Sequence, residues 1–179
     1  MELVSHLNGY LPFDIAIQEI VPVSPGSHAR FSAVSRTYQY IIAQTKDPFL
    51  SGFVFYYSVP LDIQKMNEGA AVIKSCKDFT SFAKLPSETK TNICQITDIW
   101  WEKKGSLLFF NITANRFLRN MVRAIVGTLI DLGRGKSDLN ELKEIIEAKN
   151  RSAAGASVPA CGLYLTSIRY AENIFNNIL

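Results

Sequence analysis

The sequence predicts an α+β domain with a mixed, mostly antiparallel sheet and helices packed against it. Three features predict this class: a long apolar stretch with helical periodicity that begins at Asn115, several runs of β-branched and aromatic residues, and a glycine turn that joins two of those runs. The chain has 179 residues, of which 47% are hydrophobic, so it can bury a substantial core. We expect one domain over residues 1–179.

In the first half of the chain, proline and glycine mark where the expected elements end. Residues 2–11 predict a short helix that Pro12 terminates. Three stretches are rich in β-branched or aromatic residues and predict strands: 15–23, 28–44 and 53–59. Asp62 is a good N-cap for a helix that reaches about Ser75, and the aperiodic stretch 77–91 predicts a loop.

The second half of the chain begins with a predicted hairpin. Lys104-Gly105-Ser106 separates two runs typical of strands, 93–103 and 107–114. Trp100 and Trp101 must face opposite sides of this hairpin, which favours a sheet covered on both faces. Two helices follow, over residues 115–133 and 137–149, with Asn115 and Ser137 as their expected N-caps. Residues 152–160 predict a loop, and residues 162–170 predict a final strand.

The composition argues against several classes of protein. Charged residues interrupt the apolar runs well short of the ~20 residues that a membrane-spanning helix needs. The N-terminus has no pattern of a signal segment, so we expect a soluble, cytoplasmic protein without membrane association. Cys76, Cys94 and Cys161 are widely spaced and odd in number, and they support neither a disulfide framework nor a metal site. A net charge of +3 indicates nucleic-acid binding only if basic groups cluster.

The expected helix from Asn115 carries an arginine where polar surface gives way to core. Arg116, Arg119 and Arg123 recur at intervals of three and four, and the same side turns apolar beyond Arg123. An arginine keeps its charge, so a site that removes it from water must offer a carboxylate, a phosphate or carbonyl groups. Spacing alone leaves two interpretations open, a structural ion pair with a local acid and a functional anion partner.

The expected strand 28–44 places basic and aromatic residues on one surface. Alternation puts Val34, Arg36, Tyr38, Tyr40 and Ile42 on the same face. An aromatic ring can stack on an unpaired base while a nearby guanidinium binds a phosphate, so this pattern is compatible with RNA binding. Strand tyrosines that are half-buried for packing alone give the same pattern, and that alternative stays open.

Other catalytic motifs are incomplete. Gly135-Lys136-Ser137 resembles the end of a phosphate-binding loop, but Ile130 stands where that loop requires glycine. The sequence has no Gly-x-Ser-x-Gly motif, and paired carboxylates cannot be identified by spacing among its 16 acidic residues. Residue patterns alone therefore predict an α+β domain with two arginine-bearing surfaces.

Four segments occur in an order and spacing that resemble the C-terminal half of the tRNA pseudouridine synthase A family: HARFSAVSRTYQYII, KDFTSF, ANRFLRNMVRAIVGTLIDLGRGK and PACGLYL. The resemblance covers nearly the whole chain. It implies an isomerase that converts uridine to pseudouridine in the anticodon stem-loop of tRNA, without a cofactor or metal, as a homodimer. It also implies the C-terminal half of a pseudouridine synthase-like α+β fold.

The same resemblance implies roles for individual residues. Arg123 matches the arginine that orients the family's nucleophilic aspartate, Tyr38 matches the tyrosine that packs against the flipped uracil, and Leu163 matches an apolar residue of that pocket. The Gly-Arg-Thr-Asp motif that carries the aspartate does not occur here, so we expect a C-terminal half that is inactive alone. Basic residues expected to contact phosphate are Arg30, Arg36, Lys84, Lys90, Arg116 and Arg119.

Two other classes of function remain open at this stage. The chain could be a noncatalytic RNA-binding module that uses its arginine and tyrosine face, or a dimerisation domain. An aspartate motif encoded upstream of this sequence would favour the enzyme, and a natural start at Met1 would favour the alternatives.

Overall fold

The computed structural model describes residues 2–84 and 91–175, which form two compact units. The larger unit spans residues 34–169, and the smaller one combines the N-terminal residues up to Ala33 with the segment from Tyr170 onward. Each unit is described by itself. None of the described helices is long and apolar enough to cross a membrane.

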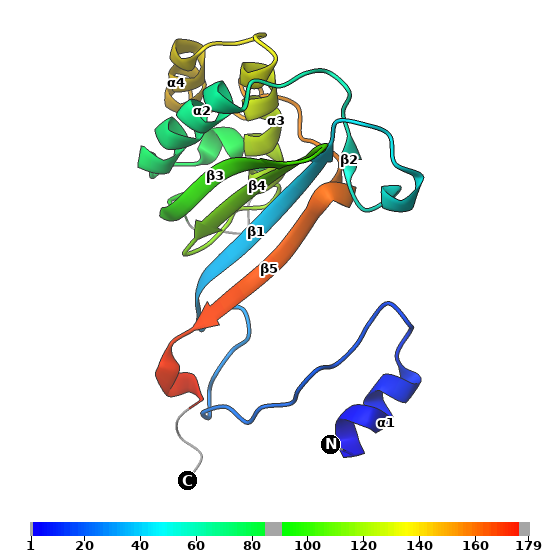
Figure 1. The fold of residues 1–179 in the computed structure, drawn as a ribbon. Helices are drawn as coiled ribbons and strands as arrows, with labels where there is room; N and C mark the ends of the chain where they lie inside the picture. Colours follow the sequence, from blue (N-terminus) through cyan, green and yellow to red (C-terminus); the bar gives the residue numbers. More distant parts are fainter. Residues whose placement is uncertain (1, 85–90, 176–179) are drawn as a thin grey trace. The chain divides into compact units, whose positions relative to one another are not determined.

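The larger unit is built on a sheet of five strands. These strands are β1 (Ala33–Ala43), β2 (Phe55–Tyr56), β3 (Ile96–Lys104), β4 (Leu107–Ala114) and β5 (Leu163–Tyr170). Their order is β2-β1-β4-β3, and β5 also pairs with β1 (Figure 1). The pairs β1–β4 and β3–β4 are antiparallel and β1–β2 is parallel, so the predicted mixed, mostly antiparallel sheet is confirmed.

Three helices lie on one side of this sheet (Figure 1). They are α2 (Ile63–Ser75), α3 (Met121–Gly133) and α4 (Leu139–Glu147). Nearly every residue of α3 is buried, and its apolar side chains join a core that includes Tyr40, Phe82 and Phe110, none of which is exposed. The helical periodicity that predicted a buried helix is thus explained by the position of α3 against the sheet.

The opposite face of the sheet carries a polar network. Gln39 donates to Asn111 over 2.9 Å, and the hydroxyls of Thr37 and Thr113 lie 2.9 Å apart. Trp101 is 3% exposed on the helical side, whereas Trp100 is 42% exposed. The two tryptophans face opposite sides as predicted, but the expectation of two covered faces was wrong for the described residues, because α2, α3 and α4 all lie on one side.

The smaller unit contains α1 (Glu2–Tyr10), as predicted, and an irregular segment that follows it. Asn8 joins this segment to the helix through two hydrogen bonds with the backbone of Ile17, of 2.8 and 2.7 Å. The strand predicted over residues 15–23 is wrong, because no described strand pairs with this stretch. Ile15 and Ile20 remain about half exposed, at 52% and 50%, so β-branched composition alone was not sufficient to form a strand.

Two other predicted strands are shorter than expected. Residues 28–32 form a turn in which His28 Nδ1 accepts from the backbone of Arg30 and Phe31, so β1 begins only at Ala33. Within residues 53–59, only the two residues of β2 pair with the sheet. Of the aromatic residues in this stretch, Phe55 and Tyr57 pack against the core, whereas Phe53 and Tyr56 are exposed.

The prediction that Asn115 caps the long helix was wrong. Asn115 Oδ1 accepts from the backbone of Gln95 over 2.9 Å, and α3 begins only at Met121. Its N-cap is Asn120, which has a left-handed backbone with φ of 67°. Asparagine tolerates that conformation better than most residues. Residues 115–120 therefore form a turn before α3, and Arg116 and Arg119 lie in that turn.

The caps of the other helices follow the expected chemistry with one change of residue. Asp62 accepts from the backbone of Lys65 at the start of α2, as predicted. At α4 the N-cap is Asp138 and not Ser137, and Asp138 and Glu141 form a reciprocal capping box. The carboxylate satisfies two helix N–H groups, those of Asn140 and Glu141.

We predict that Asp138→Ala destabilises the protein by about 1 kcal/mol, because it leaves two N–H groups of α4 without their acceptor. Ser137→Ala is the matched control, since no side-chain hydrogen bond of Ser137 caps α4. Chemical denaturation of both variants measures the difference in unfolding free energy. Equal effects of the two substitutions would contradict the assignment of Asp138 as the cap.

Candidate functional site

Arg123 lies in the first turn of α3, at the edge of the buried core. Its side chain is half-buried, and its Nε donates to the backbone carbonyl of Val158 over 2.6 Å. The backbone N–H of Val158 returns a bond to the carbonyl of Arg123 over 3.2 Å. These two contacts join the start of α3 to the segment that precedes β5.

No described carboxylate pairs with Arg123. The ion pairs described for residues 2–84 and 91–175 use other basic residues: Asp78, Asp98 and Glu102 have one lysine partner each, and Asp131 pairs with Arg134 and Lys136. The structural interpretation of Arg123 as a local ion pair therefore has no partner in this part of the chain. Because Nε is occupied, the two terminal nitrogens form the part of the guanidinium that can bind a carboxylate in a planar, two-point contact.

Tyr38 lies in the middle of β1, where it pairs with Ile112 of β4. Its ring is half-buried and meets the ring of Phe117 edge to face, with centroids 5.0 Å apart. Tyr38, Phe117 and Leu163 all pack at the border of the core that α3 fills. The helical side of the sheet thus presents an aromatic ring and apolar walls on the same side as α3, an arrangement that suits a planar, partly apolar ligand.

Tyr40, two residues further along β1 on the same face, is fully buried. Its hydroxyl donates to the carbonyl of Pro159 over 2.7 Å, next to the residue that holds Arg123. Burial raises the pKa of this hydroxyl far above its ordinary value, Cys161 raises it further and the charge of Arg123 opposes the shift. Tyr40 therefore stays protonated and remains a hydrogen-bond donor.

Several predicted phosphate contacts gather around the turn of residues 115–120. Arg36 Nη1 donates to the carbonyl of Asn115 over 2.7 Å, which places the arginine of β1 at this turn. The backbone N–H of Lys84 donates to the carbonyl of Arg119 over 3.0 Å. Arg119 and Lys84 are exposed, and Arg116 is half-buried. Four of the predicted basic residues thus lie close to the start of α3.

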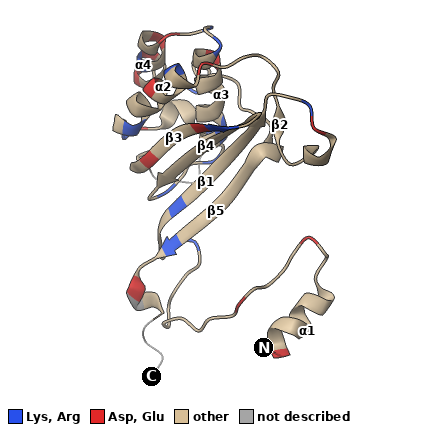
Figure 2. Ribbon diagram, in the orientation of Figure 1, with Lys and Arg blue, Asp and Glu red and all other residues tan. Residues whose placement is uncertain are grey.

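The other two predicted basic residues are not placed relative to this group. Arg30 belongs to the smaller unit, where its guanidinium lies 5.6 Å from the centre of the Phe31 ring. Lys90 lies outside the described residues. Figure 2 shows basic positions on β1 and β5, whereas acidic and basic positions alternate over α2 and α4. The helical layer therefore lacks a uniform basic surface, whereas β1 and β5 carry a basic residue each, Arg36 and Arg169, and no acidic one.

Sequence analysis missed two residues of β5 that share a face with Leu163. Alternation along the strand places Leu165 and Arg169 on that face, and both are exposed. Thr166 Oγ1 donates to the carbonyl of Thr37, which sets β5 alongside the part of β1 that carries Tyr38. The period-two pattern in GLYLTSIRY, counted from Leu163, would have identified both residues.

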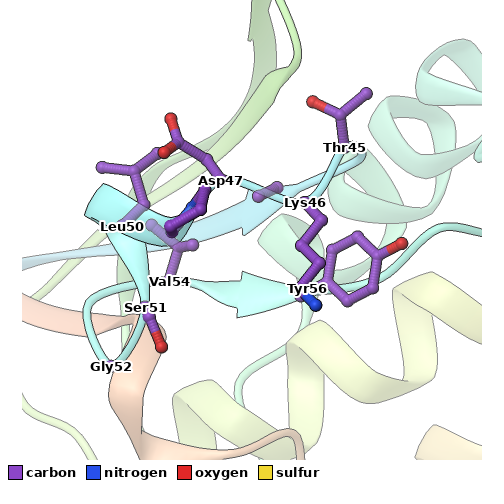
Figure 3. A pocket seen from close by; sticks show the side chains of 10 residues that line it. Thr45, Lys46, Asp47, Leu50, Ser51, Gly52, Val54 and Tyr56 are labelled. Carbon is purple, nitrogen blue, oxygen red and sulfur yellow. The ribbon is translucent and has the colours of Figure 1, made fainter.

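A cavity near the end of β1 does not contain these residues. It has a volume of about 500 Å³ and is lined by residues between Ala43 and Tyr56 (Figure 3). Asp47, the acidic residue of its lining, accepts from the backbone of Phe49 and so caps the local turn. A smaller cavity of about 210 Å³ lies along α3 beside residues 156–159. Within the described residues, no group of His, Cys, Asp and Glu is arranged to hold a metal ion.

Comparison with known proteins gives a consistent family match. A family described as tRNA pseudouridine synthase matches residues 76–171. The tRNA pseudouridine synthase A of Parabacteroides distasonis is 48% identical over 173 residues, which cover 97% of this chain and 69% of the relative. The protein of that name from Azobacteroides pseudotrichonymphae is 46% identical, over 98% of this chain and 70% of the relative.

A more distant relative gives the same result. The tRNA pseudouridine synthase A of Bacillus subtilis is 40% identical over 166 residues, covering 92% of this chain and 67% of that protein. The matches thus span nearly all of the chain, including β1, α3 and β5, and about two thirds of each relative.

Proposed function

This chain belongs to the tRNA pseudouridine synthase family, and from that premise we propose that Arg123, Tyr38 and Leu163 form one side of the pocket in which a tRNA uridine is isomerised. The main support for the proposal is the environment of the Arg123 side chain. It is half-buried at the start of α3, its Nε is held by a carbonyl, and no described carboxylate pairs with it. A carboxylate is the partner that its remaining donors fit best.

The attacking carboxylate is, in this proposal, an aspartate from a segment outside these 179 residues. The chain contains no Gly-Arg-Thr-Asp motif, and in this proposal it acts as the C-terminal part of the synthase, which corresponds to about two thirds of a relative and not to the expected half. We use the term complete synthase for a protein that joins this chain to a segment with that motif. The guanidinium of Arg123 would align the aspartate for attack and keep it ionised beside the apolar walls.

The reaction needs no net oxidation or reduction. The bond from the ribose to N1 of uracil breaks, the base turns, and the ribose carbon joins C5, while a proton leaves C5 and N1 gains one. Tyr38 packs against the base during the turn, and its hydroxyl assists removal of the proton from C5. Leu163 and Phe117 supply apolar surface around the base, which keeps water from the reacting atoms.

Basic residues around the turn 115–120 are the proposed phosphate contacts. Arg36, Lys84, Arg116 and Arg119 gather there, and Arg30 and Lys90 are proposed to extend the contact surface. The substrate is the anticodon stem-loop of tRNA, bound in the cytoplasm. Backbone contacts of this kind position an RNA, whereas selection of the uridine depends on the pocket.

We predict that Arg123→Lys reduces turnover of the complete synthase by roughly a hundredfold or more, because lysine keeps the charge but loses the planar fork that aligns a carboxylate. Binding of tRNA should change little, since the lysine preserves the charge. Single-turnover rates and equilibrium binding measure the two effects separately. Normal turnover in this variant would show that Arg123 has only a structural role.

We predict that Tyr38→Phe loses most turnover of the complete synthase but still binds tRNA. Phenylalanine keeps the ring that meets Phe117 and removes only the hydroxyl. Thermal unfolding should be nearly unchanged, because Tyr38 is half-buried and no described side chain depends on its hydroxyl. A variant with unaltered turnover would leave Tyr38 as a packing residue.

We predict that tRNA binding by this chain alone is weak and falls steeply with salt. The net charge is only +3, and the basic residues near the 115–120 turn form part of a larger contact surface. Titration at several salt concentrations gives the slope of log affinity against log salt. Affinity that stays constant up to several hundred millimolar salt would contradict the phosphate contacts.

We propose that the complete synthase is a homodimer. The uncovered sheet face supports this, since Trp100 is 42% exposed there. We predict that sedimentation equilibrium gives twice the mass of one complete chain at micromolar concentration. A monomer mass at all concentrations would contradict the proposal without affecting the assignment of Arg123 and Tyr38.

A further inference from the structure

We infer that Tyr40 is a positioning residue for the reaction: by anchoring the segment of residues 151–159, it fixes the direction in which Arg123 presents its terminal nitrogens. This inference rests on the proposed function. It concerns a residue that touches neither the base nor the attacking carboxylate, and it assigns a role to a segment that connects α4 to β5.

The Nε donor of Arg123 sets the orientation of its guanidinium. A guanidinium has five donors in a fixed plane, so a bond at Nε determines where the two terminal nitrogens point. The acceptor is the backbone carbonyl of Val158, at 2.6 Å. A backbone carbonyl moves only with its segment, so the orientation of Arg123 depends on the conformation of residues 151–159.

Hydrogen bonds within the segment 151–159, and from it to the start of α3, hold its conformation. Arg151 donates to the carbonyl of Gly155 over 3.1 Å and to the hydroxyl of Ser157 over 2.7 Å. Asn120, the left-handed N-cap of α3, also donates to Ser157, over 2.5 Å. Ser157 thus connects the segment to the residue that begins α3, three positions before Arg123.

The segment 151–159 also lies directly against the backbone of α3. A Cβ atom at Gly127 would collide with the carbonyl oxygen of Ala156, and one at Gly155 would lie 2.9 Å from the backbone of Thr128. The backbone N–H of Gly155 donates to the Thr128 hydroxyl over 3.0 Å. Two glycines therefore allow helix and segment to meet backbone to backbone, which leaves little room for Val158 to shift.

The sheet side of the segment is anchored by Tyr40. Its hydroxyl donates to the carbonyl of Pro159 over 2.7 Å, one residue beyond the carbonyl that holds Arg123. Tyr40 is fully buried, and its protonated state is secured by that burial. Without the hydroxyl, the carbonyl of Pro159 loses this partner in the core, and residues 158–159 can move to find another.

The test uses the complete synthase with three variants. Tyr40→Phe removes the anchor and keeps the ring. Ser157→Ala removes the anchor on the helix side, and it tests the same idea if Tyr40→Phe fails to fold. Tyr164→Phe is the matched control, because its hydroxyl also donates to a backbone carbonyl, that of Phe53, which lies in the connection before β2 and outside the segment of residues 151–159. Measurements are kcat, KM, tRNA affinity and thermal unfolding.

Tyr40→Phe is expected to lower kcat by about ten- to a hundredfold, the scale on which a misplaced catalytic group acts. The KM and the tRNA affinity should stay within about twofold of wild type, because Tyr40 makes no substrate contact. Ser157→Ala should lower kcat in the same direction, and Tyr164→Phe should leave it within about twofold. A purely structural role would instead lower stability and binding together with kcat.

A kcat for Tyr40→Phe and Ser157→Ala equal to that of Tyr164→Phe would overturn the inference. So would a loss of kcat that is matched by equal losses of tRNA affinity and thermal stability. Arg123→Lys distinguishes failure of the proposed site from failure of the positioning role. If Arg123→Lys turns over normally, the proposed site is wrong. If Arg123→Lys is inactive while Tyr40→Phe and Ser157→Ala turn over normally, only the positioning role of Tyr40 is wrong.

Discussion

A charged arginine at the first turn of an otherwise buried helix is the constraint on which this structure depends. Burial of α3 against the sheet supplies much of the core, and the same burial brings Arg123 partly out of water. A half-buried guanidinium needs acceptors. The Val158 carbonyl supplies one of them, so this bond links Arg123 to the segment before β5, which Gly127 and Gly155 allow to lie close to α3.

Strand β1 contributes both to the hydrophobic core and to the proposed substrate pocket. Its residues Tyr40 and Ile42 are fully buried and belong to the core, whereas Tyr38 on the same face is only half-buried. The transition from core to surface therefore occurs along a single strand, at the residue proposed to contact the base. Exposed Leu165 of β5 lies on the same side as Leu163, so apolar surface continues beyond the part that the helices cover.

The sequence predicted the elements whose stability is local. The periodicity of α3, the cap at Asp62 and the hairpin turn at Gly105, which has φ of 61°, depend on residues close in the chain. The strand predicted over 15–23 failed for the opposite reason, because a strand exists only if another strand pairs with it. Asn115 has the chemistry of a helix cap, but its side chain is used by Gln95 of a distant segment.

Local patterns specify only part of the candidate site. Periodicity places Arg123 and Tyr38 on their helix and strand faces, and family resemblance implies their roles, which stay a prediction. The roles of Tyr40, Ser157 and Val158 depend on hydrogen bonds between residues 35 to 119 positions apart, which no local pattern specifies. The segment 152–160 was correctly predicted as a loop from its small and polar residues, but its contacts with α3 could not be derived from them.

The central claim is that this chain holds the orienting and base-packing residues of a uridine isomerase while the attacking aspartate lies elsewhere. The most direct measurement is turnover on unmodified tRNA by the purified 179-residue chain, with the relative from Parabacteroides distasonis as positive control. We expect pseudouridine formation by the control and none above background by the chain. Turnover by the chain alone would contradict it, because the attacking group would then have to be among its own residues.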